Sequence, residues 1–121
     1  MRTFNKDGHK IIWGDVVEAL QTEVEDGSVD LIFVDPPYNI GKNFNGRKDR
    51  WPTEKTYLDW CYKWIDLCID KLKENGSLYL MAATQSMPHI DIYLRKRLHI
   101  LSRIVWYYDS LPLSRFVQVD R

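Results

Sequence analysis

The sequence lacks the features that mark membrane, secreted or fibrous proteins. Its 121 residues contain no apolar run approaching the about 20 residues that a membrane-spanning helix needs. The opening segment, MRTFNKDGHK, is charged and polar and does not resemble a signal peptide. Glycine is scarce, at 6 residues, and has no repeating period, which excludes a collagen-like chain. We therefore expect a protein of the cytoplasm.

Cysteine and histidine are equally sparse. The two cysteines, Cys61 and Cys68, lie in one segment with helical periodicity. Seven helical positions separate them by about 10 Å, beyond the about 7 Å that a disulfide spans. Both fall on the apolar face, so we expect two buried thiols in a reducing compartment. His9, His89 and His99 have no metal-ligand spacing, so no metal site is expected.

Neither sign of charge is in excess. The 17 Lys and Arg residues balance 17 Asp and Glu residues, for a formal net charge of 0. A free-standing nucleic-acid binder is usually basic, so the composition argues mildly against that class. Hydrophobic residues make up 45% and aromatic residues 13%, which argues for a packed core and against disorder. The length fits one domain.

Strand-like and helix-like segments alternate along the chain. Strands are expected over residues 10–13, 29–34, 77–81 and 100–107, and helices over residues 16–20, 53–72 and 88–98. The run at 29–34, VDLIFV, is mostly apolar, as in a strand covered on both faces. This alternation indicates the α/β class with a mainly parallel sheet.

The segment after the strand at 29–34 carries the clearest chemical signal. Asp35, Pro36, Pro37 and Tyr38 stand at its carboxyl end, where ligands bind in open parallel sheets. The prolines fix φ and lack backbone N–H groups, which leaves nearby carbonyls as rigid acceptors. A carboxylate, a carbonyl and an aromatic face together suit a planar group that bears an exocyclic amine. The alternative is an ordinary loop, in which the aspartate forms a turn or caps a helix.

This tetrapeptide resembles the catalytic motif of amino-group DNA methyltransferases, which methylate adenine N6 or cytosine N4. Further blocks resemble, in the right order, the opening of the β-class adenine-specific enzymes: residues 11–15, 18–20, 28–35, 39–44, 76–80 and 103–106. The resemblance implies a partial, incomplete Rossmann-like fold of the S-adenosylmethionine-dependent methyltransferases. Residues 1–110 are then the N-terminal portion of a catalytic domain, and residues 111–121 form a divergent or truncated tail.

The resemblance also implies a mechanism, with double-stranded DNA as the substrate. An adenine is flipped out of the duplex, and Tyr38 stacks on it. Asp35 and the Pro36 carbonyl accept the two N–H bonds of N6, which localises the lone pair for attack on the methyl group of S-adenosylmethionine. Cytosine N4 and RNA base methyltransferases share the tetrapeptide, so these substrates stay open.

Two further groups of residues gain roles from the resemblance. In similar enzymes an acidic residue at the position of Asp15 faces the adenine of the cofactor; the alternative is a turn that caps a helix. Lys42, Arg47 and Lys48 lie in a basic loop past the tetrapeptide, where we expect them to contact DNA phosphates. A solvated loop is the alternative for each of them.

Several aromatic residues follow that loop, among them Trp51, Tyr57, Trp60 and Trp64. Aromatic side chains near a base-binding loop invite a stacking role. The helical spacing of the last three favours packing in the core instead.

The chain departs from the family in its glycines. The family binds S-adenosylmethionine with a glycine-rich turn, and none of the 6 glycines here has Gly-x-Gly spacing. In the family's sheet, strands absent from this chain lie between those ending at Asp15 and Asp35, so the strand at 29–34 is expected to have an open apolar edge. We therefore expect a chain that cannot methylate alone: either it needs a complementing chain that carries the cofactor motif, or it is an inactive remnant.

Overall fold

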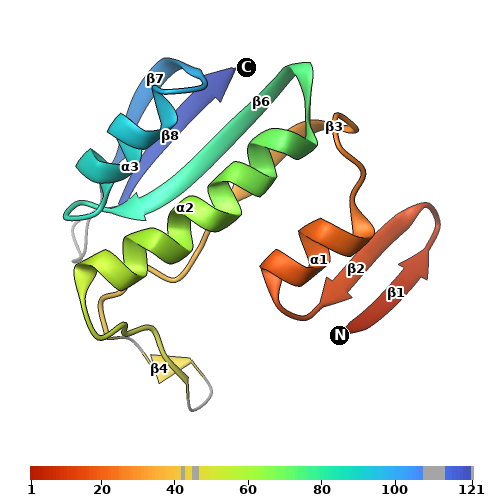
Figure 1. The fold of residues 1–121 in the computed structure, drawn as a ribbon, viewed down its shortest axis with the longest axis horizontal. Coiled ribbons are helices and arrows are strands. Elements are labelled where there is room, and N and C mark those ends of the chain that lie inside the picture. The colour runs from red at the N-terminus through yellow and green to blue at the C-terminus, as the bar shows by residue number, and fades with distance from the viewer. Residues whose placement is uncertain (42, 45–46, 108–113, 121) are drawn as a thin grey trace.

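The computed structural model describes residues 1–41, 43–44, 47–107 and 114–120 (Figure 1). The elements of this part are, in order, β1 (Arg2–Lys6), β2 (His9–Trp13), α1 (Val16–Glu23), β3 (Val29–Val34), β4 (Asn43–Phe44), β5 (Arg47–Lys48), α2 (Glu54–Lys71), β6 (Leu72–Ala83), α3 (Met87–Leu94), β7 (His99–Trp106) and β8 (Ser114–Asp120). Every strand and helix expected from the sequence is present, most of them with shifted ends, and the α/β class is confirmed. No helix in the described ranges is long and apolar enough to cross a membrane.

The chain begins with a hairpin that the sequence analysis only half predicted. Strands β1 and β2 pair antiparallel, with Lys6 opposite His9. The two loop residues, Asp7 and Gly8, both have positive φ, at 50° and 78°. An Asp-Gly pair suits this turn because glycine adopts positive φ at no steric cost. The hairpin forms a two-stranded sheet of its own, so β2 does not join the larger sheet.

The larger sheet has four strands in the order β3-β6-β8-β7. Strand β6 runs parallel to β3, and β8 runs antiparallel to both β6 and β7. Three of the four strands therefore share one direction, but only the β3–β6 pair is parallel, so the parallel part of the expected sheet is small. Strand β8 lies within the segment expected to be a divergent tail, and it pairs with β6 along its whole length.

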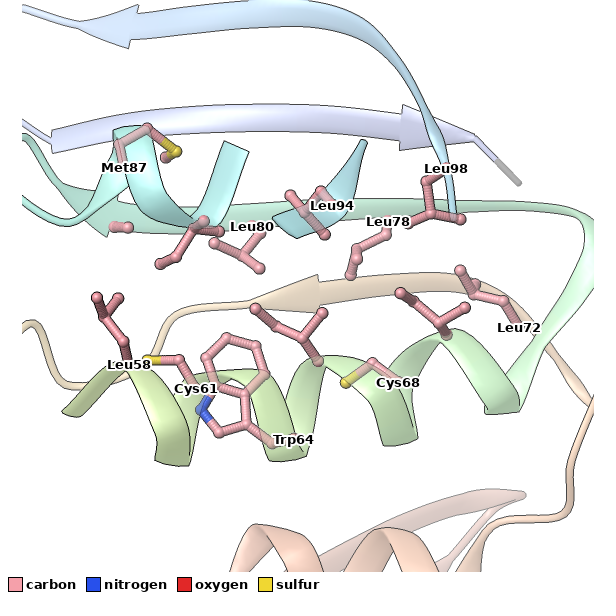
Figure 2. Packing of buried hydrophobic residues seen from close by; sticks show 14 of the residues in the cluster. Leu58, Cys61, Trp64, Cys68, Leu72, Leu78, Leu80, Met87, Leu94 and Leu98 are labelled. Atoms are coloured by element: carbon pink, nitrogen blue, oxygen red, sulfur yellow. The ribbon is translucent and has the colours of Figure 1, made fainter. Parts of the chain in front are cut away.

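The core lies between this sheet and two helices. Thr53 caps the N-terminus of helix α2, and its side chain accepts from the Thr56 backbone N–H in a capping box. Its apolar face and that of α3 pack on β6, as Figure 2 shows for Leu78 and Leu80, which are both fully buried. The close-up also labels Cys61 and Cys68, which are free, buried thiols as predicted.

Helices α2 and α3 cover one face of the sheet (Figure 1), and the other face carries exposed apolar side chains. On β3, Leu31 is 58% exposed and Phe33 is 59% exposed. On β7, Leu101 and Val105 are also exposed. Within the described part of the chain, β3 pairs only with β6, so the open edge expected for this strand is present.

Candidate functional site

The tetrapeptide directly follows β3, at the carboxyl end of the parallel β3–β6 pair. The Asp35 side chain is exposed, so a ligand can reach its carboxylate, and Tyr38 is half-buried. The Tyr38 hydroxyl donates to Asp35 Oδ1 at 2.6 Å, and it lies 4.0 Å from the Met81 sulfur at the end of β6. The structure therefore brings the predicted acceptor and the predicted stacking residue together. Oδ2 of Asp35 is a second acceptor beside them.

The two proline carbonyls have different surroundings. The Tyr57 hydroxyl, from the first turn of α2, donates to the Pro37 carbonyl at 2.6 Å. Burial raises the pKa of Tyr57 far above its usual range, so this hydroxyl stays protonated and remains a donor. No hydrogen bond to the Pro36 carbonyl is found within the described residues, so it is the proline carbonyl left to accept from a ligand.

Tyr57 therefore has two roles, of which sequence reasoning found one. It is fully buried, as its helical spacing predicted, and its ring packs edge-on against Trp51 at 4.8 Å between centroids. Trp64 is buried and Trp60 packs against the same cluster, so core packing is confirmed for all three. The hydroxyl contact with the tetrapeptide has no signal in the sequence, because it joins positions 20 residues apart.

Asp49 is a residue of the site that the sequence analysis did not single out. It is only 5% exposed, although it follows directly after the basic residues of the loop. Its Oδ2 accepts from the Tyr38 backbone N–H at 3.3 Å, and its main-chain carbonyl accepts from Gly41 N–H at 3.2 Å. Asn39 and Gly41 have positive φ, at 62° and 79°, so the chain turns tightly here. These two residue types could have predicted the turn, but not its contact with Asp49.

Asp15 lies at the start of helix α1 and not beside the tetrapeptide in the chain. It is the N-cap of α1, and its side chain accepts from the Glu18 backbone N–H at 3.0 Å. The helix-cap alternative is therefore what the structure shows. No hydrogen bond or ion pair joins Asp15 to the tetrapeptide in the part of the chain that the structure describes, and the cofactor role stays a prediction.

The basic loop is described in part. Lys42 lies outside the described residues. Arg47 and Lys48 form β5, which pairs antiparallel with β4 through Phe44 and Asn43. The loop expected here thus contains a small ribbon, at a short distance along the chain from the tetrapeptide. The contact of these three residues with DNA stays a prediction.

Comparisons with known proteins agree with the motif. A family model described as DNA methylase matches residues 29–120. The DNA adenine methyltransferase YhdJ of Escherichia coli K12 is 48% identical over 107 residues, which cover 88% of this chain and 36% of that protein. The chain thus spans about a third of the length of several curated relatives that it matches.

Solved structures share the fold. The PvuII DNA methyltransferase, which is cytosine-N4-specific, aligns with a TM-score of 0.67 at 14% identity, covering 88% of this chain and 47% of that one. A Thermus thermophilus protein described as a DNA modification methylase, in complex with S-adenosyl-L-methionine, aligns with a TM-score of 0.64 at 18% identity, covering 89% and 53%. The partial methyltransferase fold is therefore confirmed.

Proposed function

Because the chain belongs to the DNA methylase family, we propose that it carries the base-binding part of a site-specific DNA adenine-N6 methyltransferase. The observation that supports this is the tetrapeptide itself, with Asp35 exposed at the carboxyl end of β3 and the Tyr38 hydroxyl 2.6 Å from it. Double-stranded DNA is the proposed substrate. The two free thiols suit action in the reducing cytoplasm.

On this proposal the flipped adenine presents its amine to two acceptors. Asp35 Oδ2 accepts one N6 proton, while Oδ1 keeps its hydrogen bond from Tyr38. The Pro36 carbonyl accepts the other proton, because Tyr57 already donates to the Pro37 carbonyl. Two acceptors placed in advance draw electron density onto the nitrogen, which makes N6 a better nucleophile. Stacking on the Tyr38 ring holds the base, a contact worth about 1–3 kcal/mol per base.

The fit to S-adenosylmethionine, which supplies the methyl group in this family, is incomplete. Asp15, the residue expected to face its adenine, uses a carboxylate oxygen to cap α1. The sequence has no Gly-x-Gly turn. We therefore propose that a complementing chain supplies most of the cofactor site. Asp15 contributes its other carboxylate oxygen, Oδ1, which does not take part in the helix cap.

Two features support a complementing chain. Strand β3 is an edge strand of its sheet, and an edge strand with exposed apolar side chains such as Leu31 readily accepts another strand. The relatives that the chain matches are about three times longer, so they have additional polypeptide that could take this place. An inactive remnant would show both features as well. A measurement of methyltransferase activity therefore separates a complemented enzyme from a remnant.

The test is reconstitution. The full chain is mixed with the part of E. coli YhdJ that lies outside the matched residues, and methylated nucleosides are measured in duplex DNA. N6-methyladenine is expected with both pieces and with neither alone. Asp35→Asn should lower the rate by about 100-fold or more, as loss of a preorganised polar contact does. Asp30→Asn is the matched control, since Asp30 is an exposed carboxylate of β3 paired with Lys73 at 3.0 Å.

Three results would count against the proposal. N4-methylcytosine as the product would favour the cytosine alternative, and methylation of RNA alone would favour an RNA base. Association of the two pieces without any product would favour the inactive remnant. Calorimetry of the chain alone with S-adenosylmethionine is the companion measurement, and saturable binding there would show a more complete cofactor site than we propose.

A further inference from the structure

Asp49 is a buried carboxylate beside the tetrapeptide, and its burial requires an explanation. The side chain lies in a segment with Arg47, Lys48 and Arg50 as sequence neighbours, yet it is 5% exposed while Arg50 is exposed. Removing a carboxylate from water is costly unless hydrogen bonds replace the lost hydration. What Asp49 contacts therefore indicates what its position does for the molecule.

Within the described residues, the hydrogen bonds that Asp49 accepts come from the backbone of the turn after the prolines. Oδ2 accepts from the Tyr38 N–H at 3.3 Å, and the Asp49 carbonyl accepts from the Gly41 N–H at 3.2 Å. Beside them, the Trp51 N–H donates to Asn39 Oδ1 at 2.9 Å. Three hydrogen bonds thus join residues 49–51 to residues 38–41. One of them is accepted from the backbone N–H of Tyr38.

We propose that Asp49 is the positioning residue of Tyr38, an inference that rests on the proposed function. By holding the Tyr38 backbone N–H, Asp49 fixes the start of a side chain whose hydroxyl reaches Asp35 Oδ1 at 2.6 Å and whose ring is to receive the base. Tyr57 holds the preceding residue through the Pro37 carbonyl. The tetrapeptide is therefore fixed from both sides of the Pro37–Tyr38 peptide bond.

The second carboxylate oxygen makes the proposal testable. Oδ1 of Asp49 is buried and has no hydrogen-bond partner in the described ranges. Asp49→Asn keeps one oxygen to accept from the Tyr38 N–H and places the amide nitrogen where Oδ1 lies. Asp49→Ala removes the acceptor altogether. Positioning through the hydrogen bond predicts that the amide variant keeps the function and the alanine variant loses it.

Two readouts on the full chain test this. The first is hydrogen exchange of the Tyr38 backbone amide by NMR. The second is the fluorescence of a single-stranded oligonucleotide with one 2-aminopurine, an adenine analogue that stacking on an aromatic ring quenches. Asp49→Ala should speed exchange at Tyr38 by about tenfold, the size expected for one lost hydrogen bond, and should weaken quenching to the level of Tyr38→Ala. Asp49→Asn and the control Asp30→Ala should retain both properties.

The outcomes separate this inference from the proposed function. Quenching that depends on Tyr38 but not on Asp49 would overturn the positioning role. Loss of Tyr38 protection in a folded Asp49→Asn variant would also overturn it, and this arm holds even where Asp49→Ala does not fold. If the wild-type chain does not quench the 2-aminopurine fluorescence, this result would count against base binding. The positioning of Tyr38 would still be supported if its backbone amide exchanges faster in Asp49→Ala and stays protected in Asp49→Asn.

Discussion

Removing the Tyr57 hydroxyl should lower the free energy of unfolding more than the loss of a single oxygen atom usually does. Tyr57→Phe deletes one oxygen atom and leaves the ring in its buried place against Trp51. The Pro37 carbonyl then loses a hydrogen bond of 2.6 Å from a donor that is always protonated. The Cys61 thiol on the same helix also loses its contact with this hydroxyl, so the loss falls on the Pro37 carbonyl and on Cys61.

The structure sets the expected magnitude. A buried hydrogen bond contributes about 0.5–1.5 kcal/mol, and a buried acceptor left without a partner costs about 1–3 kcal/mol. Pro37 is exposed, so water can partly replace the lost hydroxyl. We therefore expect the free energy of unfolding to fall by about 1–2 kcal/mol. For a domain of this size, that lowers Tm by about 4–8 °C.

The assay is urea unfolding with a matched control on the same helix. Tyr62→Phe removes the same atom from a half-buried tyrosine whose ring stacks on Tyr93 at 4.0 Å between centroids. Its hydroxyl makes no hydrogen bond within the described residues, so this variant should stay within about 0.5 kcal/mol of the wild type. Equal midpoints for the two variants would refute the assigned role of the Tyr57 hydroxyl.

Three other predictions follow from packing and charge. Leu80→Ala in the centre of the sheet should lower the free energy of unfolding by about 2–5 kcal/mol in the same urea assay, and a loss below about 1 kcal/mol would contradict the described core. Arg103 Nε donates to Asp91 Oδ2 at 2.7 Å, and this hydrogen bond holds the pKa of Asp91 below its usual value. Asp91 therefore stabilises the folded state above about pH 4, and this contribution is lost as the pH falls through the lowered pKa. Arg103→Gln should therefore destabilise the protein at pH 7 more than at pH 3, and equal losses at both pH values would count against the pair. Burial raises the pKa of both the Cys61 and Cys68 thiols to about 12, so neither should react with a thiol reagent at pH 8 until urea unfolds the chain, whereas prompt labelling of the native protein would show that they are accessible.

The parts of the fold that local sequence determines were predictable. An apolar run identified β3 with its ends unchanged, and apolar spacing identified α2 to within a residue at each end. Strand β8 was missed because only its pairing with β6 and β7 defines it, and such long-range contacts leave no local pattern. Strand β1 was missed although the Asp7-Gly8 turn is a recognised hairpin signal, since its residues are mostly polar.

The site shows the same division. Asp35 and Tyr38 were predictable because they follow a strand at an end where ligands bind, and their contact confirms that they lie together. Asp49 and Tyr57 approach the tetrapeptide only through the tertiary fold, from 11 and 20 residues away along the chain. The sequence alone therefore predicts which residues meet a ligand, and the structure adds the residues that hold them.

The attachment of Pro37 to helix α2 also affects the entropy of binding. Tyr57 belongs to the first turn of a helix whose later turns, at Cys68 and Ile69, lie within the core. The tetrapeptide is thus ordered as part of the same event that forms the core. Ordering a free loop costs about 1–2 kcal/mol per residue, and here that cost is met during folding rather than when a ligand arrives. A planar ligand therefore meets acceptors already in place, so that more of its contact energy appears as affinity.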